Sequence, residues 1–197
     1  SDHGAWRHGK ATLHEGGLRI PLLIHWPTGI APGSTYDGLV QNADLAPTLL
    51  EVAGITDYAD LGGDGVSLLD VLRGDTAKVH DYLYAEIGYA RAIITPDWKY
   101  IATRYSQEVD EQIAAGKTFV GKDAVPLERP YLTRNQHLGH HASQHNPNYF
   151  VLDQLYNLKE DPREDTNLFS PDNQVADRLK WILTEELKRL PCAPFGE

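Results

Sequence analysis

The chain opens with residues whose types could bind a divalent cation and an anion. Asp2 and His3 place a carboxylate beside an imidazole, and the glycine after them lets the backbone bend close to a ligand. A glycine-rich stretch follows, in which Lys10 precedes Glu15 and Arg19. A lysine on such a loop offers a mobile positive charge for an oxyanion. Each of these patterns is also typical of a solvated turn, so their chemistry depends on the elements around them.

A nearly continuous apolar run, residues 18–26, directly follows the Lys10 loop. It contains Pro21 near its start, where a missing backbone N–H is tolerated in a strand. Such a run predicts a strand buried on both faces, as in a parallel α/β sheet. Ligands in α/β folds bind at the ends of strands, so the position of Lys10 favours an anion site.

Two helices are predicted in the next part of the chain. Asp44 predicts the N-cap of a helix over 45–53, which Gly54 ends and whose leucines face inward. A shorter helix is predicted over 67–73, with Gly74 as its stop. Together with the apolar run before them, these helices indicate an α/β arrangement in the first part of the chain.

The rest of the chain predicts a small antiparallel sheet with a helix. Three β-type runs lie between residues 81 and 104, and a turn signal at 95–98 separates the last two. A further strand or two is predicted over 149–158. Ser170 predicts the N-cap of a final helix over 171–190, whose apolar stripe covers one face of the meander.

Between these strands lies a polar stretch, residues 105–148, that is rich in turn formers and predicts a long surface excursion. Gly139 and Pro147 weaken any helix there. A histidine-rich tract of this kind is compositional evidence only, although its spacing could hold zinc if it were helical. The tract contains His137, His140, His141 and His145.

Composition excludes several classes of protein. The 197 residues carry a formal charge of −10 without a Lys/Arg-rich run, which argues against binding to nucleic acid or to an anionic membrane. The longest apolar run is far shorter than the ~20 residues of a membrane span. Cys192 is the single cysteine, so no disulfide forms within the chain. The chain has no methionine at all and opens on a ligand-like motif, which indicates a fragment of a longer protein.

Several motifs, in order, resemble the second half of a type I sulfatase of the alkaline phosphatase superfamily. They are SDHG, GKATLHEGGLRIP, LIHWPTGIAPG, NADLAPTLLEVAGI and DGVSLLDVLRG. The tail motifs ITPDWKYI and QLYNLKEDPREDTNLF are similar to the small C-terminal subdomain of the same enzymes. The resemblance covers most of the chain except 105–148, and the ordered set is far more specific than any one motif.

The resemblance implies a fold and an activity. Residues 1–76 would be the C-terminal portion of the sulfatase α/β domain, part of an alkaline-phosphatase-like mixed sheet. Residues 77–197 would be a C-terminal α+β subdomain, a small antiparallel sheet with a packed C-terminal helix. The parent enzyme would hydrolyse a sulfate ester, preferentially on a carbohydrate, to an alcohol and sulfate.

Site residues are carried over by position in the motifs. Asp2 matches a ligand of the active-site cation, which is usually calcium, and His3 stands where many sulfatases have Asn and others have His. Lys10 matches the lysine that contacts the sulfate group. For Glu15 and Arg19 we expect a structural role in shaping the loop. The cation and Lys10 together would stabilise the charge that spreads over the sulfuryl oxygens in the transition state.

The nucleophile of a sulfatase is absent from this chain. The family carries it in a motif Cys-x-Pro-Ser-Arg, whose cysteine becomes formylglycine, and Cys192 does not match that motif. We therefore expect formylglycine in a missing N-terminal half, which would be the first partner of this chain, and we expect the chain alone to be inactive. The family also implies an extracytoplasmic location, periplasmic or secreted, and loops of the C-terminal subdomain that border the cleft. The substrate contacts expected from such loops are Arg134, His137 and His140.

Two alternatives stay open. His3 suits zinc or manganese better than calcium, and related phosphodiesterases and phosphonate hydrolases also use an Asp-His-Gly element. The EGGLRIP segment and the tail favour the sulfatase over these enzymes. Without the resemblance, the chain could also be a non-enzymatic module that holds a small anion on its Lys10 loop.

Overall fold

The computed structural model describes a large part of the chain. The described residues are 9–10, 12–57, 63–75, 78–107, 111, 115, 119–120, 126–127 and 145–190. Two compact units divide the chain. One combines Ser1–Pro21 with Tyr84–Glu197, and the other is Leu22–Leu83. These units do not test the predicted domain limits 1–76 and 77–197, which stay a prediction.

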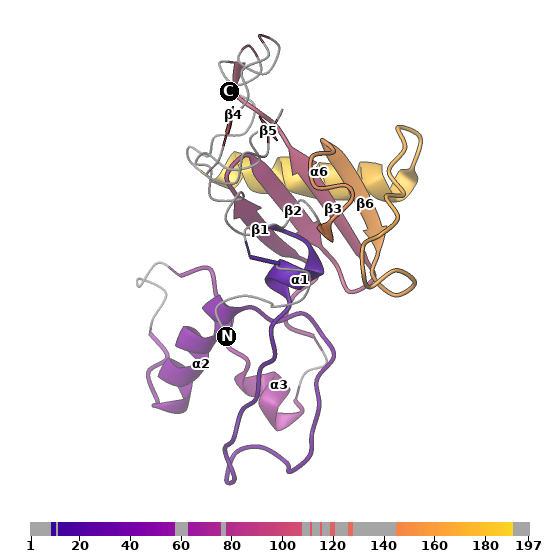
Figure 1. Cartoon of the computed structure of the whole chain (residues 1–197). Helices are drawn as coiled ribbons and strands as arrows, with labels where there is room; N and C mark the ends of the chain where they lie inside the picture. Colours follow the sequence, from indigo (N-terminus) through magenta and orange to yellow (C-terminus); the bar gives the residue numbers. More distant parts are fainter. Residues whose placement is uncertain are drawn as a thin grey trace. The chain divides into compact units, whose positions relative to one another are not determined.

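A four-stranded sheet forms the first unit, as predicted (Figure 1). Its order is β1-β2-β3-β6, and both β2–β3 and β3–β6 pair antiparallel. The turn between β2 and β3 is the predicted one, because Thr95 N–H donates to the carbonyl of Trp98 at 2.8 Å. The strands are β1 (Leu83–Ile87), β2 (Ala90–Ile94), β3 (Trp98–Thr103) and β6 (Asp153–Asn157).

The helix α6 (Gln174–Arg189) packs on β2 and β3, which confirms the predicted packing of the final helix. Its buried stripe consists of Ala176, Leu179, Ile182 and Leu183. The predicted cap is wrong. Asn173, not Ser170, caps the helix, because its side chain accepts hydrogen bonds from Val175 N–H at 2.9 Å and Ala176 N–H at 3.2 Å.

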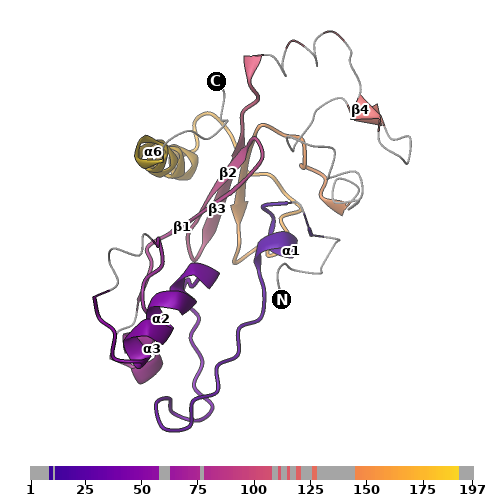
Figure 2. The ribbon, with the colours of Figure 1, turned by 90° about the vertical axis from the view of Figure 1, so that its left-hand side faces the viewer.

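A one-turn helix, α1 (Glu15–Leu18), lies against the opposite face of the sheet, where Lys99 of β3 meets Glu15. Figure 2, in which the sheet is seen nearly edge-on, shows α1 on one side and α6 on the other. Side chains alternate along a strand, so β3 directs Lys99 towards α1 and Tyr100 towards the α6 face, where it meets Phe169. All five residues of β2 are buried.

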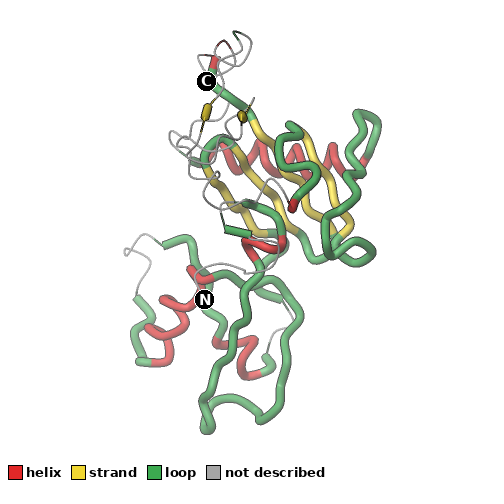
Figure 3. The backbone as a smooth tube through the Cα atoms, in the orientation of Figure 1, coloured by secondary structure: helices red, strands yellow, loops and turns green. Residues whose placement is uncertain are grey.

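The predicted strand over 18–26 is wrong. Helix α1 occupies its start, and residues 19–26 belong to a long segment without regular structure (Figure 3). The apolar side chains there are not buried, since Leu23 is 95% exposed. An extended segment becomes a strand only when a neighbour pairs with it, and no strand among the described residues does so.

The second unit holds three short helices around a buried acid. They are η2 (Asn42–Asp44), α2 (Leu45–Val52) and α3 (Leu69–Arg73), with Gly54 and Gly74 just beyond the last two, as predicted. Asp44 is the N-cap residue of α2, as predicted, but its side chain makes no capping hydrogen bond to this helix. Its fully buried carboxylate instead accepts from Gln41 N–H at 2.8 Å and Val66 N–H at 2.9 Å and lies 2.9 Å from His80 Nε2.

The inward face predicted for α2 is also different. Leu49 is 68% exposed, and the buried residues of this helix are Pro47 and Thr48. The Thr48 hydroxyl accepts from Leu68 N–H at 2.8 Å and so ties α2 to the segment before α3. Buried polar contacts through Asp44 and Thr48 therefore tie this unit together, beside the buried Leu68 and Leu69.

The predicted excursion over 105–148 is described only in part. It contains two strands of two residues, β4 (Phe119–Val120) and β5 (Pro126–Leu127), which pair antiparallel. Most of the histidine-rich tract lies outside the described residues, as does Cys192. None of the helices within the described ranges is both long and apolar enough to cross a membrane.

Candidate functional site

The described part of the predicted site is the loop that carries Lys10. Lys10 is exposed in a turn, while Gly9 before it is buried. Glu15 opens α1, and Arg19 follows that helix with an exposed side chain. Five other predicted site residues lie outside the described residues: Asp2, His3, Arg134, His137 and His140.

Backbone contacts between glycines fix the start of this loop against α1. A Cβ added to Gly9 would collide with the backbone of Gly16 and Gly17, and one added to Gly17 would collide with the carbonyl of Gly9. Only glycine permits two backbones to approach so closely. The residue next to Lys10 therefore lies directly on α1.

A buried hydrogen-bonded pair fixes the loop on the other side of Lys10. Thr12 and His14 are 4% and 1% exposed, and the Thr12 hydroxyl lies 2.6 Å from His14 Nδ1. The same hydroxyl accepts from His14 N–H at 3.0 Å. The His14 carbonyl then accepts from Gly17 N–H at 2.8 Å and from Leu18 N–H at 3.1 Å, which continues the loop into α1. Thr12 and His14 thus act as a structural anchor.

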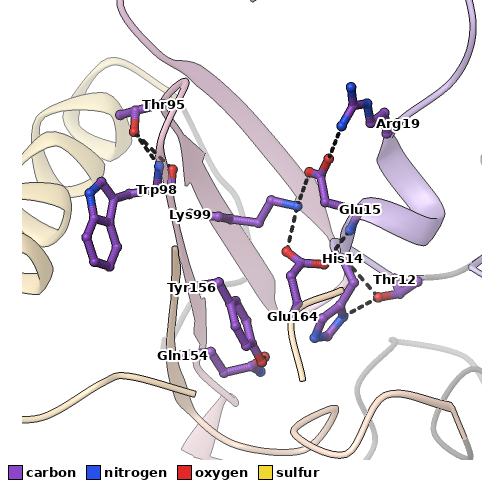
Figure 4. Close-up of polar contacts among 10 residues, drawn as sticks. All are labelled: Thr12, His14, Glu15, Arg19, Thr95, Trp98, Lys99, Gln154, Tyr156 and Glu164. Atoms are coloured by element: carbon purple, nitrogen blue, oxygen red, sulfur yellow. Dashed lines mark hydrogen bonds and ion pairs between the residues drawn. The ribbon is translucent and has the colours of Figure 1, made fainter. Parts of the chain in front are cut away.

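An ion cluster joins α1 to the sheet (Figure 4). The ammonium of Lys99, on β3, lies 2.6 Å from Glu15 Oε1 and 2.8 Å from Glu164 Oε1. Glu164 Oε2 also accepts from Glu15 N–H at 2.5 Å. The side chains of Lys99 and Glu164 are both 0% exposed. We call Lys99, Glu15 and Glu164 the buried ion cluster.

Electrostatics explains the composition of this cluster. Burial raises the pKa of the Glu164 carboxyl above its usual range, and the Lys99 ammonium and the Glu15 N–H oppose that rise. A buried charge is tolerated only when it is paired and hydrogen-bonded. Lys99 meets two acids, and Arg19 lies 4.0 Å from Glu15 Oε2 at the exposed edge of the cluster.

Tyr156 and Gln154 lie on the buried side of the loop, next to His14. The rings of His14 and Tyr156 lie 5.8 Å apart, and the Tyr156 hydroxyl donates to Gln154 Oε1 at 2.8 Å. Burial raises the pKa of the Tyr156 phenol well above its usual range, so this group stays neutral. Tyr156 and Gln154, both labelled in Figure 4, belong to β6.

The described residues contain no group of three or more His, Cys, Asp or Glu side chains that could hold a metal ion. The two carboxylates that come together, Glu15 and Glu164, already share the Lys99 ammonium. A cation would have to displace that ammonium, so the buried ion cluster does not fit a metal. Asp2 and His3 have the oxygen and nitrogen donors for one, and their role stays a prediction.

The arrangement can bind an anion. It presents one exposed ammonium, Lys10, on a loop whose two sides are fixed by glycine contacts and by the Thr12–His14 pair. Sequence reasoning missed Lys99 and Glu164, which hold α1 in place. A charge between apolar residues in the β3 run was the signal for Lys99, whereas Glu164 lies in a polar turn with no pattern to mark it.

Comparisons of the sequence with known proteins find a matching family model and several relatives. Residues 2–112 match a family model described as N-sulphoglucosamine sulphohydrolase, C-terminal. An ulvan-active sulfatase of Formosa agariphila is 32% identical over 214 residues, which cover 97% of this chain and 39% of the relative. Arylsulfatase A of Bos taurus is 30% identical over 177 residues, 88% of this chain and 30% of that enzyme. The chain thus spans well under half the length of these relatives.

Solved structures show the same fold. A protein in complex with its substrate D-glucosamine-2-N,6-O-disulfate matches with a TM-score of 0.57 at 24% identity, over 90% of this chain and 30% of that protein. A protein of a Bacteroides thetaiotaomicron glycosaminoglycan locus matches with a TM-score of 0.59 at 22% identity, over 92% and 31% of the two chains. With the ordered motifs and the matched family model, the chain belongs to the type I sulfatase family and corresponds to the C-terminal region of these enzymes.

Proposed function

We propose that this chain is the C-terminal part of a sulfatase that hydrolyses a sulfate ester to an alcohol and inorganic sulfate. The carrying observation is the exposed Lys10 on a fixed loop, in a chain that belongs to this family. Hydrolysis spreads negative charge over the sulfuryl oxygens in the transition state. An ammonium that is already in position stabilises that charge without reorganisation of the loop.

Asp2 and His3 are proposed as ligands of the active-site cation. A divalent ion, when bound, supplies a second positive charge at the sulfuryl oxygens. The carboxylate of Asp2 suits calcium, whereas the imidazole of His3 also suits zinc or manganese. Calcium is the proposal because the relatives are sulfatases and the family usually carries that ion.

The nucleophile is proposed to lie in a part of the enzyme that this chain does not contain. The sequence has no Cys-x-Pro-Ser-Arg motif in which formylglycine would form. A site that holds Lys10 but no nucleophile cannot cleave the ester. We therefore propose that the chain alone is inactive, and that its partner in the site is the N-terminal half of the same enzyme.

A sulfated carbohydrate is the proposed substrate. Two relatives support this choice by name, the ulvan-active sulfatase and a human N-acetylglucosamine-6-sulfatase that is 46% identical over 65 residues. A steryl-sulfatase of Rattus norvegicus, 27% identical over 165 residues, represents the alternative of a smaller substrate. Arg134, His137 and His140 are proposed to contact the part of the substrate that carries the sulfate. We also propose an extracytoplasmic location for the enzyme, as the family implies and as a glycan substrate outside the cytoplasm would require.

The test uses the full-length protein that carries this chain. Sulfate release from sulfated oligosaccharides is measured beside turnover of a phosphodiester and a phosphonate ester, and the bound metal is quantified by mass spectrometry. We expect sulfate release and calcium. Turnover of the phosphodiester or phosphonate with tightly bound zinc would favour the related hydrolases. Binding of sulfate by the isolated chain at micromolar affinity, with no turnover by the full-length protein, would favour an anion-binding module.

A further inference from the structure

The buried ion cluster contains more charge than packing of the sheet requires. Lys99 projects from β3 into a fully buried position between two acids, Glu15 and Glu164. Ion pairs of this kind are weak evidence for stability, since apolar residues of similar volume often hold a core as well. What a charged cluster does supply is a defined geometry, because each of its members accepts only a few directions of contact.

Glu164 adopts an unusual backbone conformation at this place. Its φ is 58°, in the left-handed region, and it is the one non-glycine residue with positive φ among those described. Residues other than Gly, Asn and Asp rarely adopt a backbone conformation in that region. The turn is closed by Glu164 N–H, which donates to the Asp161 carbonyl at 3.0 Å. This conformation directs one carboxylate oxygen to Lys99 and the other to the N–H of Glu15.

A chain of contacts continues from this cluster to Lys10. Lys99 and Glu164 hold Glu15, the first residue of α1. Gly16 and Gly17, the next residues of α1, touch the backbone of Gly9. Gly9 is followed directly by Lys10. Each link is a backbone contact or a buried ion pair, so a shift of α1 moves the loop.

We propose that Lys99 and Glu164 are positioning residues for Lys10, acting through α1. The inference rests on the proposed function, since the group that Lys10 would meet is the sulfate of the substrate. Both side chains are fully buried, so neither contacts substrate. Their effect on catalysis passes through the direction in which the loop presents the Lys10 ammonium, and misplacement of such a group by about 1 Å lowers rates by roughly 100-fold.

A double-mutant cycle in the full-length protein tests this coupling. Lys99→Met, Lys10→Ala and the double variant are compared by kcat/KM for a sulfate ester. We expect Lys99→Met to lower kcat/KM roughly 10- to 100-fold, mostly through kcat. The double variant should fall no further than Lys10→Ala alone. Losses that multiply would show that Lys99 acts independently of Lys10 and would overturn the proposal.

A matched control separates this effect from the loss of any lysine. Lys159 forms an ion pair with Asp97 at 2.7 Å, but its side chain is 69% exposed. Lys159→Met should leave kcat/KM within about 2-fold, because exposed pairs fix little geometry. If Lys99→Met does not fold, Glu164→Gln takes its place in the same cycle. That variant keeps an oxygen for the Glu15 N–H and places an uncharged amide NH2 where the carboxylate oxygen faces Lys99.

Hydrogen exchange gives a readout that does not depend on activity. The amides of Gly17, Leu18 and Arg19, which donate within the loop, should exchange at least about 10-fold faster in Lys99→Met, while those of β2 stay unchanged. Unchanged exchange at these three amides would overturn the proposal. Absence of sulfatase activity in the unmodified protein would contradict the proposed function instead, and exchange would still decide whether the cluster positions the loop.

Discussion

The two compact units of this chain differ in how far their large apolar side chains are exposed. In the sheet unit, β2 is wholly buried, and buried charges such as Lys99 have acidic partners. In the 22–83 unit, large apolar side chains face solvent, since Leu23 is 95% exposed and Leu49 is 68% exposed. Within the described residues, the first unit buries a whole strand, whereas the second leaves Leu23 and Leu49 uncovered.

The difference shows which elements can find their packing partners within this part of the chain. An antiparallel sheet is built from neighbouring segments joined by short turns, so β2 and β3 find each other within the chain. A strand buried on both faces needs partners on each side, and residues 19–26 have none among the described residues. Their exposure supports the proposal that the chain is part of a longer sulfatase.

Hydrogen exchange of the chain should show the largest contrast between the two regions. Amides of β3 lie between two paired strands, whereas residues 20–26 form no strand. We expect β3 amides to exchange slower by roughly 1,000-fold or more, because they open only in large-scale unfolding. In the full-length protein, residues 20–26 should gain protection. Equal protection of β3 and of residues 20–26 in the chain would contradict the expected difference between the two units.

Core substitutions should show the next largest contrast. Leu155 on β6 is 0% exposed, so Leu155→Ala should lower the free energy of unfolding by about 2–5 kcal/mol. Leu23→Ala, at a site 95% exposed, should change it by less than about 0.5 kcal/mol. Urea denaturation of the chain measures both. A loss at Leu23 as large as at Leu155 would mean that the 22–26 segment is packed in solution.

A smaller effect is expected from a charged pair at the edge of the sheet. Asp153 accepts from Tyr100 Oη at 2.5 Å and from Arg104 Nη2 at 2.6 Å. Burial alone would raise the pKa of the Asp153 carboxyl, but Arg104 and Tyr100 hold it below its usual range. Its stabilising contribution is therefore present above the unfolded pKa of about 3.9 and is lost as pH falls through the lower folded pKa.

The variant Asp153→Asn should lower the free energy of unfolding by about 1–3 kcal/mol at pH 7, and this difference should shrink below about pH 4. Urea denaturation at pH 7 and pH 3 measures it. Asp97→Asn is the control, since its pair with Lys159 is exposed and should contribute at most about 1 kcal/mol. A difference at Asp153 that grows towards acid pH would contradict the assigned charge state.

Elements with local signals could be predicted from the sequence. The turn at 95–98 and the last helix depend on nearby residues, although Asn173 replaces Ser170 as the cap because its side chain reaches two N–H groups of α6. The absence of the predicted 18–26 strand could not be foreseen, because an apolar run shows what a segment can bury and not whether a partner strand is present.

The candidate site was predictable only in its exposed part. Lys10 lies in a motif that the sequence displays, and the structure places it on an exposed turn. The support of that turn comes from Lys99 and Glu164, which follow it by many residues in the chain and meet Glu15 only through the fold of the sheet. No spacing rule connects such distant residues, so this part of the site required the structure.

One measurement tests the central claim most directly, that this region presents Lys10 to a sulfate ester. The full-length protein is compared with Lys10→Ala and with Arg19→Ala, which removes a cation of the same loop whose side chain is 78% exposed. Sulfate release from a sulfated oligosaccharide should fall roughly 100- to 1,000-fold in kcat/KM for Lys10→Ala, and by less than about 5-fold for Arg19→Ala. Equal losses in the two variants, or an unchanged rate in Lys10→Ala, would contradict the account.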